Sequence, residues 1–186
     1  MFRGHNTEPM NKTVLTYGLI AGLIVTVMMW LTLGSGEHDF DNGLWIGYTT
    51  MVVAFSTIFF AVKTFRDKQN EGVITFGKAF RMGLYITLIA STMYVASWMV
   101  LSATSDHDYM ADYYEHTKAE LEASGLPQAE MDAELQKMRD MTALYNNNIA
   151  VKIGFTYTEI LPVGLLISLL CAGLLKRRSP EMRSGA

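Results

Sequence analysis

Four long apolar blocks constrain the fold of this chain more than any other feature of its sequence. They cover residues 14–33, 44–62, 83–103 and 149–175. Each block has close to the roughly 20 residues that a helix needs to cross the hydrocarbon core of a bilayer. Backbone groups in lipid must form hydrogen bonds within their own segment, so each block is predicted to be a helix. The sequence therefore indicates an all-α integral membrane protein with one membrane domain, residues 1–186, and four transmembrane helices.

The charged residues of the connections predict the orientation of these helices. The N-terminal segment, the second connection and the C-terminal segment carry Lys and Arg. The first connection carries Glu37, Asp39 and Asp41 and no basic residue, and the third has ten carboxylates against three basic residues. Basic connections stay on the cytoplasmic side of a membrane. We therefore expect both termini in the cytoplasm (N-in/C-in) and the first and third connections outside it.

The third connection has the pattern of an αα-hairpin, predicted over residues 106–145. Apolar residues recur there at helical spacing, first around Tyr113 and again around Leu135. Between the two runs, Gly125 is suited to the end of one helix and Pro127 to the start of the next. We expect this hairpin on the extracytoplasmic side.

Residues 73–82 allow two interpretations. They are too polar for a complete span, and their apolar residues can share one face while Lys78 and Arg81 point toward lipid headgroups. The segment is therefore either a short interfacial helix or the first turns of the third span.

Small residues form two predicted helix-packing seams. Gly18 and Gly22 are four residues apart in the first span, and Gly164, Ser168 and Ala172 repeat at fours in the last. Small residues at this spacing let helix backbones approach closely. We expect the second seam either to pack against a flanking helix or to form a homodimer contact.

Glu159 lies about ten residues inside the last apolar block, so a helix places it roughly 15 Å deep. A carboxylate at such depth costs on the order of 3 kcal/mol unless it is paired or faces water. Thr156 shares its predicted face, and Pro162 removes a backbone hydrogen bond nearby. We expect Glu159 to face the bundle interior. It is either a polar clamp that fixes helix register or a proton or substrate site; the remaining alternative is that it faces lipid or a partner protein.

The predicted partner of Glu159 is a basic or hydroxyl side chain of the third span. Lys78, Arg81, Tyr85 and Thr92 share one helical face there. If the span includes residues 74–82, Arg81 is expected to reach toward the carboxylate. If that segment is interfacial, Tyr85 is the expected partner.

The sequence offers no motif for catalysis or for a cofactor. The net charge is −3, so the chain lacks the excess of basic residues that is typical of nucleic-acid-binding proteins. Cys171 is the one cysteine and therefore has no disulfide partner within the chain. Asp112, His116 and Glu120 are spaced to share a helical face, but acids and histidines on a solvated helix are usually only solvated. We therefore expect no catalytic residue, no metal and no cofactor.

Several stretches resemble an uncharacterised bacterial family of four-span membrane proteins, a domain-of-unknown-function family frequent in Bacteroidetes-type genomes. They are ITFGKAFRMGLYITLIASTMYV at 74–95, KAELEASG at 118–125 and TEILPVGLLISLLCAGLLKRR at 158–178, with YGLIAG at 17–22 and FRDK at 65–68. The resemblance covers nearly the whole chain. It implies a bacterial inner (cytoplasmic) membrane location and no particular activity.

Three functions are compatible with these features of the sequence. The first is a non-enzymatic membrane subunit or scaffold, in contact with the lipid bilayer and with a partner protein or a second copy of the chain. The second is a small carrier or channel coupled to protons through Glu159, for which four spans are few and no internal repeat is visible. The third is a membrane enzyme, for which no motif argues. We favour the first by elimination.

Overall fold

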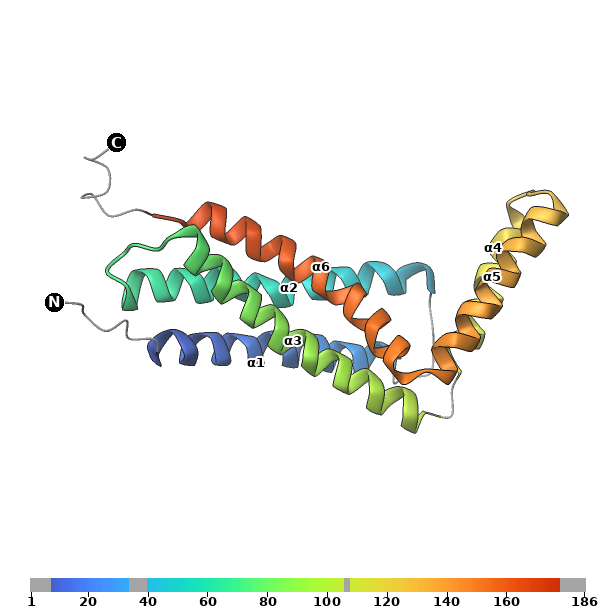
Figure 1. The fold of residues 1–186 in the computed structure, drawn as a ribbon, viewed down its shortest axis with the longest axis horizontal. Helices are drawn as coiled ribbons and strands as arrows, with labels where there is room; N and C mark the ends of the chain where they lie inside the picture. The colour runs from blue at the N-terminus through green and yellow to red at the C-terminus, as the bar shows by residue number, and fades with distance from the viewer. Residues whose placement is uncertain (1–7, 34–39, 106–107, 178–186) are drawn as a thin grey trace.

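The computed structural model describes residues 8–33, 40–105 and 108–177, which are nearly all helical. Four helices form a bundle: α1 (Glu8–Leu33), α2 (Phe40–Thr64), α3 (Phe76–Thr104) and α6 (Ile149–Leu175). α2 continues into a short π-helical segment, η1 (Phe65–Gln69). α4 (Tyr109–Ala123) and α5 (Gln128–Asn147) form a hairpin that projects from one end of the bundle (Figure 1). The predicted all-α architecture is confirmed.

All four bundle helices are long and apolar enough to span a membrane. The qualifying stretches are Met10–Leu33, Asn42–Gln69, Phe76–Thr104 and Ile149–Leu175, with 24 to 29 residues each. At 1.5 Å per residue they are about 36–44 Å long, compared with about 30 Å of hydrocarbon. Several residues at their ends therefore reach the headgroup layers. The chain is a multi-pass membrane protein.

α3 is the centre of the packing. It contacts α1 and α6 along much of its length, whereas α2 packs mainly against α1 and α6. The largest side chains of the core are apolar and almost completely buried, among them Phe55, Ile58, Met82, Ile86 and Ile160. Between them lie small buried hydroxyl groups, which belong to Thr87, Ser91 and Ser168.

Hydrogen bonds between distant segments tie one end of the bundle together. Ile74 and Arg177 exchange two backbone hydrogen bonds of 2.9 and 2.8 Å. The side chain of Gln69, in η1, donates to the hydroxyl of Thr13, in α1, at 3.1 Å. One end of the bundle therefore holds four segments, which are the start of α1, η1, the start of α3 and the end of α6. The α4–α5 hairpin lies at the opposite end (Figure 1).

The segment 73–82 contributes the first turns of α3, the second of its two interpretations. α3 begins at Phe76, and the Thr75 hydroxyl accepts a hydrogen bond from the Lys78 backbone N–H. Before it, Glu71 and Gly72 adopt positive φ angles of 53° and 76°, which reverse the chain after η1. The segment therefore continues the third span instead of lying along the surface.

The hairpin has the turn that its sequence predicts. Ser124 ends α4, Gly125 follows with φ 71°, and Pro127 stands directly before α5. Asn148 separates α5 from α6, and its side-chain oxygen accepts from the first backbone N–H groups of α6. Within the hairpin itself, Leu135 is the single buried residue.

Candidate functional site

The small residues of α6 form its contact with α3. Gly164, Ser168 and Ala172 are all buried. A Cβ at Gly164 would collide with the Thr87 side chain, and a Cβ at Gly83 would lie 2.6 Å from the Ser168 hydroxyl oxygen. The hydroxyl groups of Thr87 and Ser168 share a hydrogen bond of 3.3 Å across this contact. The seam is therefore intramolecular, and of the two predicted uses the flanking helix is the one found.

Gly18 and Gly22 play the corresponding part between α1 and α3. A Cβ at Gly18 would lie 3.0 Å from the side chain of Ile89, and one at Gly22 would collide with the sulfur of Met93. Both glycines are buried. The two seams thus pack α3 closely against α1 and against α6.

Glu159 lies on the outer surface of the bundle, so the expectation that it faces inward was wrong. The buried face of α6 runs through Thr156, Ile160, Gly164 and Ser168, and Glu159 is exposed. At about 100° per residue, Glu159 lies roughly 120° from the centre of that face. Because close packing against α3 requires the small residues to face inward, the carboxylate is turned away from the core.

The partner of Glu159 in the structure is a hydroxyl group of α3. The phenol of Tyr94 donates to Glu159 Oε1 at 3.4 Å, a long hydrogen bond. Two residues earlier in α6, the hydroxyl group of Tyr157 shares a hydrogen bond of 3.0 Å with that of Thr92. Polar pairs therefore join α3 and α6 in the half of the bundle nearer the hairpin.

Neither Arg81 nor Tyr85 meets Glu159, which corrects the predicted pairing. α3 and α6 are antiparallel, and the Ile74–Arg177 bridge fixes their register. Arg81 precedes Tyr94 by 13 residues, about 20 Å along the helix axis, and an arginine side chain is much shorter than that. The prediction assumed spans only as long as the hydrocarbon core is thick, and the longer helices place Arg81 far from the carboxylate.

The other predicted site residues are dispersed. The Lys78 ammonium donates to the Asn70 side chain at 3.2 Å and lies 4.5 Å from the centroid of the Phe65 ring, at the end away from Glu159. Thr156 is buried on the seam side of α6 and donates to the Lys152 carbonyl. Pro162 lies exposed within α6, which continues through it. These residues do not form one site.

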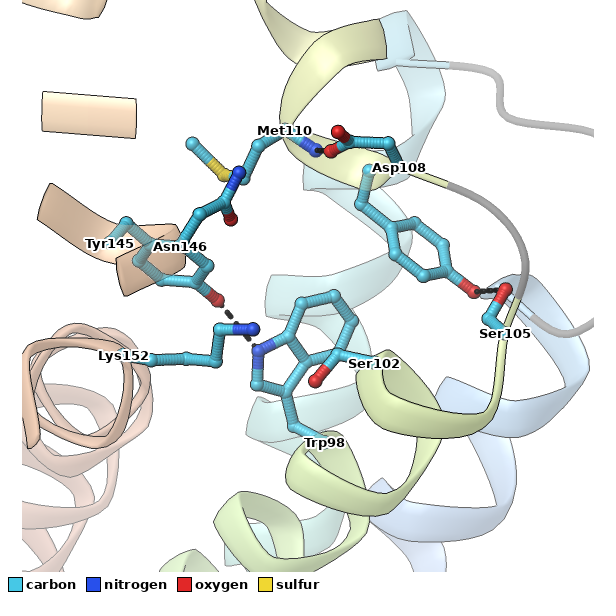
Figure 2. A pocket seen from close by; sticks show the side chains of 9 residues that line it. Trp98, Ser102, Ser105, Asp108, Met110, Tyr145, Asn146 and Lys152 are labelled. Atoms are coloured by element: carbon cyan, nitrogen blue, oxygen red, sulfur yellow. Dashed lines mark hydrogen bonds between the residues drawn. The ribbon is translucent and has the colours of Figure 1, made fainter. Parts of the chain in front are cut away.

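A polar cavity of about 300 Å³ lies where the hairpin joins the bundle. Its wall combines the end of α3 (Trp98), the start of α4 (Asp108), the end of α5 (Tyr145 and Asn146) and the first turn of α6 (Lys152). Figure 2 shows these side chains arranged around the space. The cavity brings together two segments that are far apart in sequence, residues 98–110 and 145–152.

Aromatic contacts hold the walls of the cavity in place. The Trp98 indole N–H donates to the Tyr145 hydroxyl at 2.7 Å (Figure 2). The Trp98 and Tyr109 ring centroids lie 5.2 Å apart. The Lys152 ammonium lies 5.2 Å from the centroid of the Tyr145 ring. Partial burial raises the pKa of the Tyr145 hydroxyl, so this group stays protonated at neutral pH.

The hairpin offers little for metal chemistry. His116 Nε2 lies 3.7 Å from Glu120 Oε1 on the exposed side of α4. Among the described residues, no group of three His, Cys, Asp or Glu side chains is placed to hold a metal ion.

Sequence reasoning missed Tyr94 and the whole cavity. Trp98, Tyr109 and Tyr145 carried a usable signal, because aromatic residues with a polar tip concentrate at the ends of membrane spans. Their convergence depends on how α4 and α5 fold back onto α3 and α6, which periodicity within each helix does not specify.

Comparison with known proteins identifies the family of the chain. No curated protein and no solved structure matches it. One family, described as a protein of unknown function (DUF4199), matches residues 16–177, which is most of the chain and includes α2, α3 and α6 completely and most of α1. The chain belongs to the DUF4199 family.

Proposed function

We propose that this protein is a non-enzymatic subunit of a membrane assembly that holds a partner protein through the α4–α5 hairpin. The observation that supports this proposal is how little apolar surface the two helices of the hairpin bury between them. The hairpin projects from the bundle, and Leu135 is its single buried residue (Figure 1). A helix pair gains stability from apolar surface removed from water, and this pair removes little by itself. A partner on the exposed sides of the hairpin would supply the missing burial.

The surface of the hairpin favours a partner with basic groups. Residues 108–147 carry nine carboxylates against three basic residues. Apolar side chains interrupt this acidic surface, with Leu126 41% exposed at the tip and Met141 and Leu144 52% and 53% exposed nearer the bundle. Acidic surroundings with apolar anchors suit a partner of complementary charge. A second copy of the chain would bring the same negative charge, so a different protein fits better.

The orientation of the chain belongs to this proposal. Basic residues gather at the end where η1, the start of α3 and the end of α6 meet, namely Lys63, Arg66, Lys68, Lys78, Lys176 and Arg177. Because basic segments remain in the cytoplasm, we assign that end and both termini to the cytoplasmic side. The hairpin then lies outside a bacterial inner membrane.

Labelling of single cysteines tests the orientation. In a background with Cys171→Ala, Ser124→Cys at the hairpin turn should react with a membrane-impermeant thiol reagent in intact cells. Lys68→Cys in η1, also an exposed position, should react only after the membrane is opened. The reverse pattern would show that the hairpin is cytoplasmic.

Photo-crosslinking in cells tests the scaffold role. A photoreactive amino acid at Leu126 or Met141 should capture one discrete protein, whereas the same group at Leu166, a 59% exposed residue of α6, should capture mainly lipid. Replacing residues 109–147 by a short Gly-Ser linker should abolish co-purification of the captured protein while the four spans still insert. Co-purification that persists without the hairpin would contradict the proposal.

The carrier alternative has less support. Glu159 lies on the surface of the bundle, and the next residue, Ile160, is completely buried in the interior. A proton route through Glu159 would therefore run along the outside of the helices. We also propose no enzymatic activity, because no catalytic motif occurs in the sequence.

A further inference from the structure

We propose that the cavity between the hairpin and the bundle binds a zwitterionic group, an ammonium joined to a phosphate or carboxylate. Such a group occurs in an ethanolamine phospholipid headgroup and in small soluble zwitterions. The cavity measures about 300 Å³, at the lower end of the range for small-molecule sites, so it suits a small polar group.

The first argument is the pair of opposite charges on the cavity wall. Lys152 lines one side and Asp108 the other, as Figure 2 shows. Within the described parts of the chain, neither residue takes part in an ion pair, although an ammonium and a carboxylate in one small cavity attract each other. A simple anion would be repelled by Asp108 and a simple cation by Lys152. A ligand that carries both charges satisfies both side chains.

The second argument is that both charges are held in position. Asp108 Oδ1 accepts hydrogen bonds of 3.1 Å from the backbone N–H groups of Met110 and Ala111, which leaves Oδ2 for a ligand. The Lys152 ammonium rests 5.2 Å from the centroid of the Tyr145 ring. Fixed groups lose little conformational freedom when a ligand binds, which favours affinity.

The remaining lining completes the match. The Asn146 amide, on the Lys152 side in Figure 2, can donate to a phosphate or carboxylate oxygen. The tilted rings of Trp98 and Tyr109 form an aromatic wall, a surface that attracts ammonium groups. The cavity also lies at the end of α3 and the first turn of α6, the level at which headgroups meet membrane spans.

Fluorescence titration of the purified full chain in detergent tests this site. Phe replaces Trp30 and Trp45, so that Trp98 in the cavity wall is the remaining tryptophan. The probes are short-chain phosphatidylethanolamine, short-chain phosphatidylglycerol and soluble O-phosphoethanolamine. We expect a saturable change with a zwitterionic probe and at least about tenfold weaker binding of phosphatidylglycerol, which lacks the ammonium. Binding of phosphatidylethanolamine alone identifies a lipid headgroup, and equal binding of O-phosphoethanolamine identifies a soluble zwitterion.

Two cavity variants and two matched controls decide the outcome. Lys152→Gln and Asp108→Asn should each weaken binding of the zwitterionic probe by at least about tenfold, and Lys152→Arg should retain most of it. Asp108→Asn keeps a residue that can cap α4, so loss of folding does not confound the result. Lys137→Gln and Asp132→Asn, exposed changes elsewhere on the hairpin, should bind like the parent. A lack of response to every probe, equal binding of phosphatidylglycerol, or unchanged binding in both cavity variants would overturn the proposal.

Discussion

Replacement of Gly164 by alanine should destabilise the bundle, although alanine is the better helix former. An added Cβ would lie 2.7 Å from Thr87 Oγ1 and 2.9 Å from Phe55 Cζ. Carbon atoms in folded proteins do not approach neighbours so closely, and both Thr87 and Phe55 are completely buried. Neither neighbour can move into free space, so α6 must shift away from α2 and α3.

The magnitude follows from two opposing effects. Overpacking of a core by a methyl group costs about 1–3 kcal/mol. Exchange of glycine for alanine inside a helix returns up to about 1 kcal/mol. We therefore expect Gly164→Ala to lower the free energy of unfolding by about 1–2 kcal/mol. Gly154, in the same helix, has no atom within 4 Å of an added Cβ, so Gly154→Ala should leave stability unchanged or raise it.

Reversible unfolding of both variants in mixed micelles, with increasing SDS and far-UV circular dichroism as the signal, measures the difference. The comparison between the two glycines is more informative than either value alone, because helix propensity contributes similarly to both. Equal stability of Gly164→Ala and Gly154→Ala would refute the reasoning, since it would mean that the α3–α6 contact is looser than the structure indicates.

Other predictions concern single contacts. A double-mutant cycle of Tyr94→Phe and Glu159→Gln in detergent should give a coupling of about 0.6 kcal/mol, the average for hydrogen bonds between membrane helices; zero coupling would assign Glu159 to lipid or to a partner. Asn148→Ala, which removes the cap of α6, should lower the free energy of unfolding by about 1 kcal/mol in the same SDS titration, and Asn147→Ala should change it little. Leu135→Ala should reduce hydrogen-exchange protection in α4 and α5 while the spans keep theirs; equal loss in the spans would show that hairpin and bundle unfold together.

Sequence reasoning found the elements of this fold because their signals are local. An apolar block of about 20 residues specifies a membrane helix without reference to the rest of the chain. Gly125 and Pro127 likewise mark the hairpin turn by their own backbone preferences. The small-residue seams were also visible, although the sequence left open whether a helix of the same chain or of a second copy packs on Gly164.

The residues around Glu159 are harder to predict from the sequence, because they depend on how whole helices are rotated and aligned. Helical spacing predicts Thr156 on the Glu159 face, yet Thr156 lies on the buried side, since the seam sets the rotation of α6. The thickness of a bilayer predicts that Arg81 pairs with Glu159, whereas the register of α3 and α6 follows from the Ile74–Arg177 bridge. Neither the rotation nor the register can be read from the hydrophobic pattern of one helix.

The contacts between α3 and α6 differ between the two halves of this helix pair, and this difference determines which end of the bundle can rearrange when a ligand or partner binds. In the half nearer the Ile74–Arg177 bridge, glycine and small hydroxyl residues hold the helices close, as at Gly164 and Thr87. In the other half, long hydrogen-bonding side chains take over, as at Tyr94 with Glu159. The cavity and the hairpin begin beyond this second half. Because aligned polar contacts can exchange partners more easily than a close-packed seam can deform, rearrangement on ligand or partner binding should be confined to the hairpin end while the opposite end stays rigid.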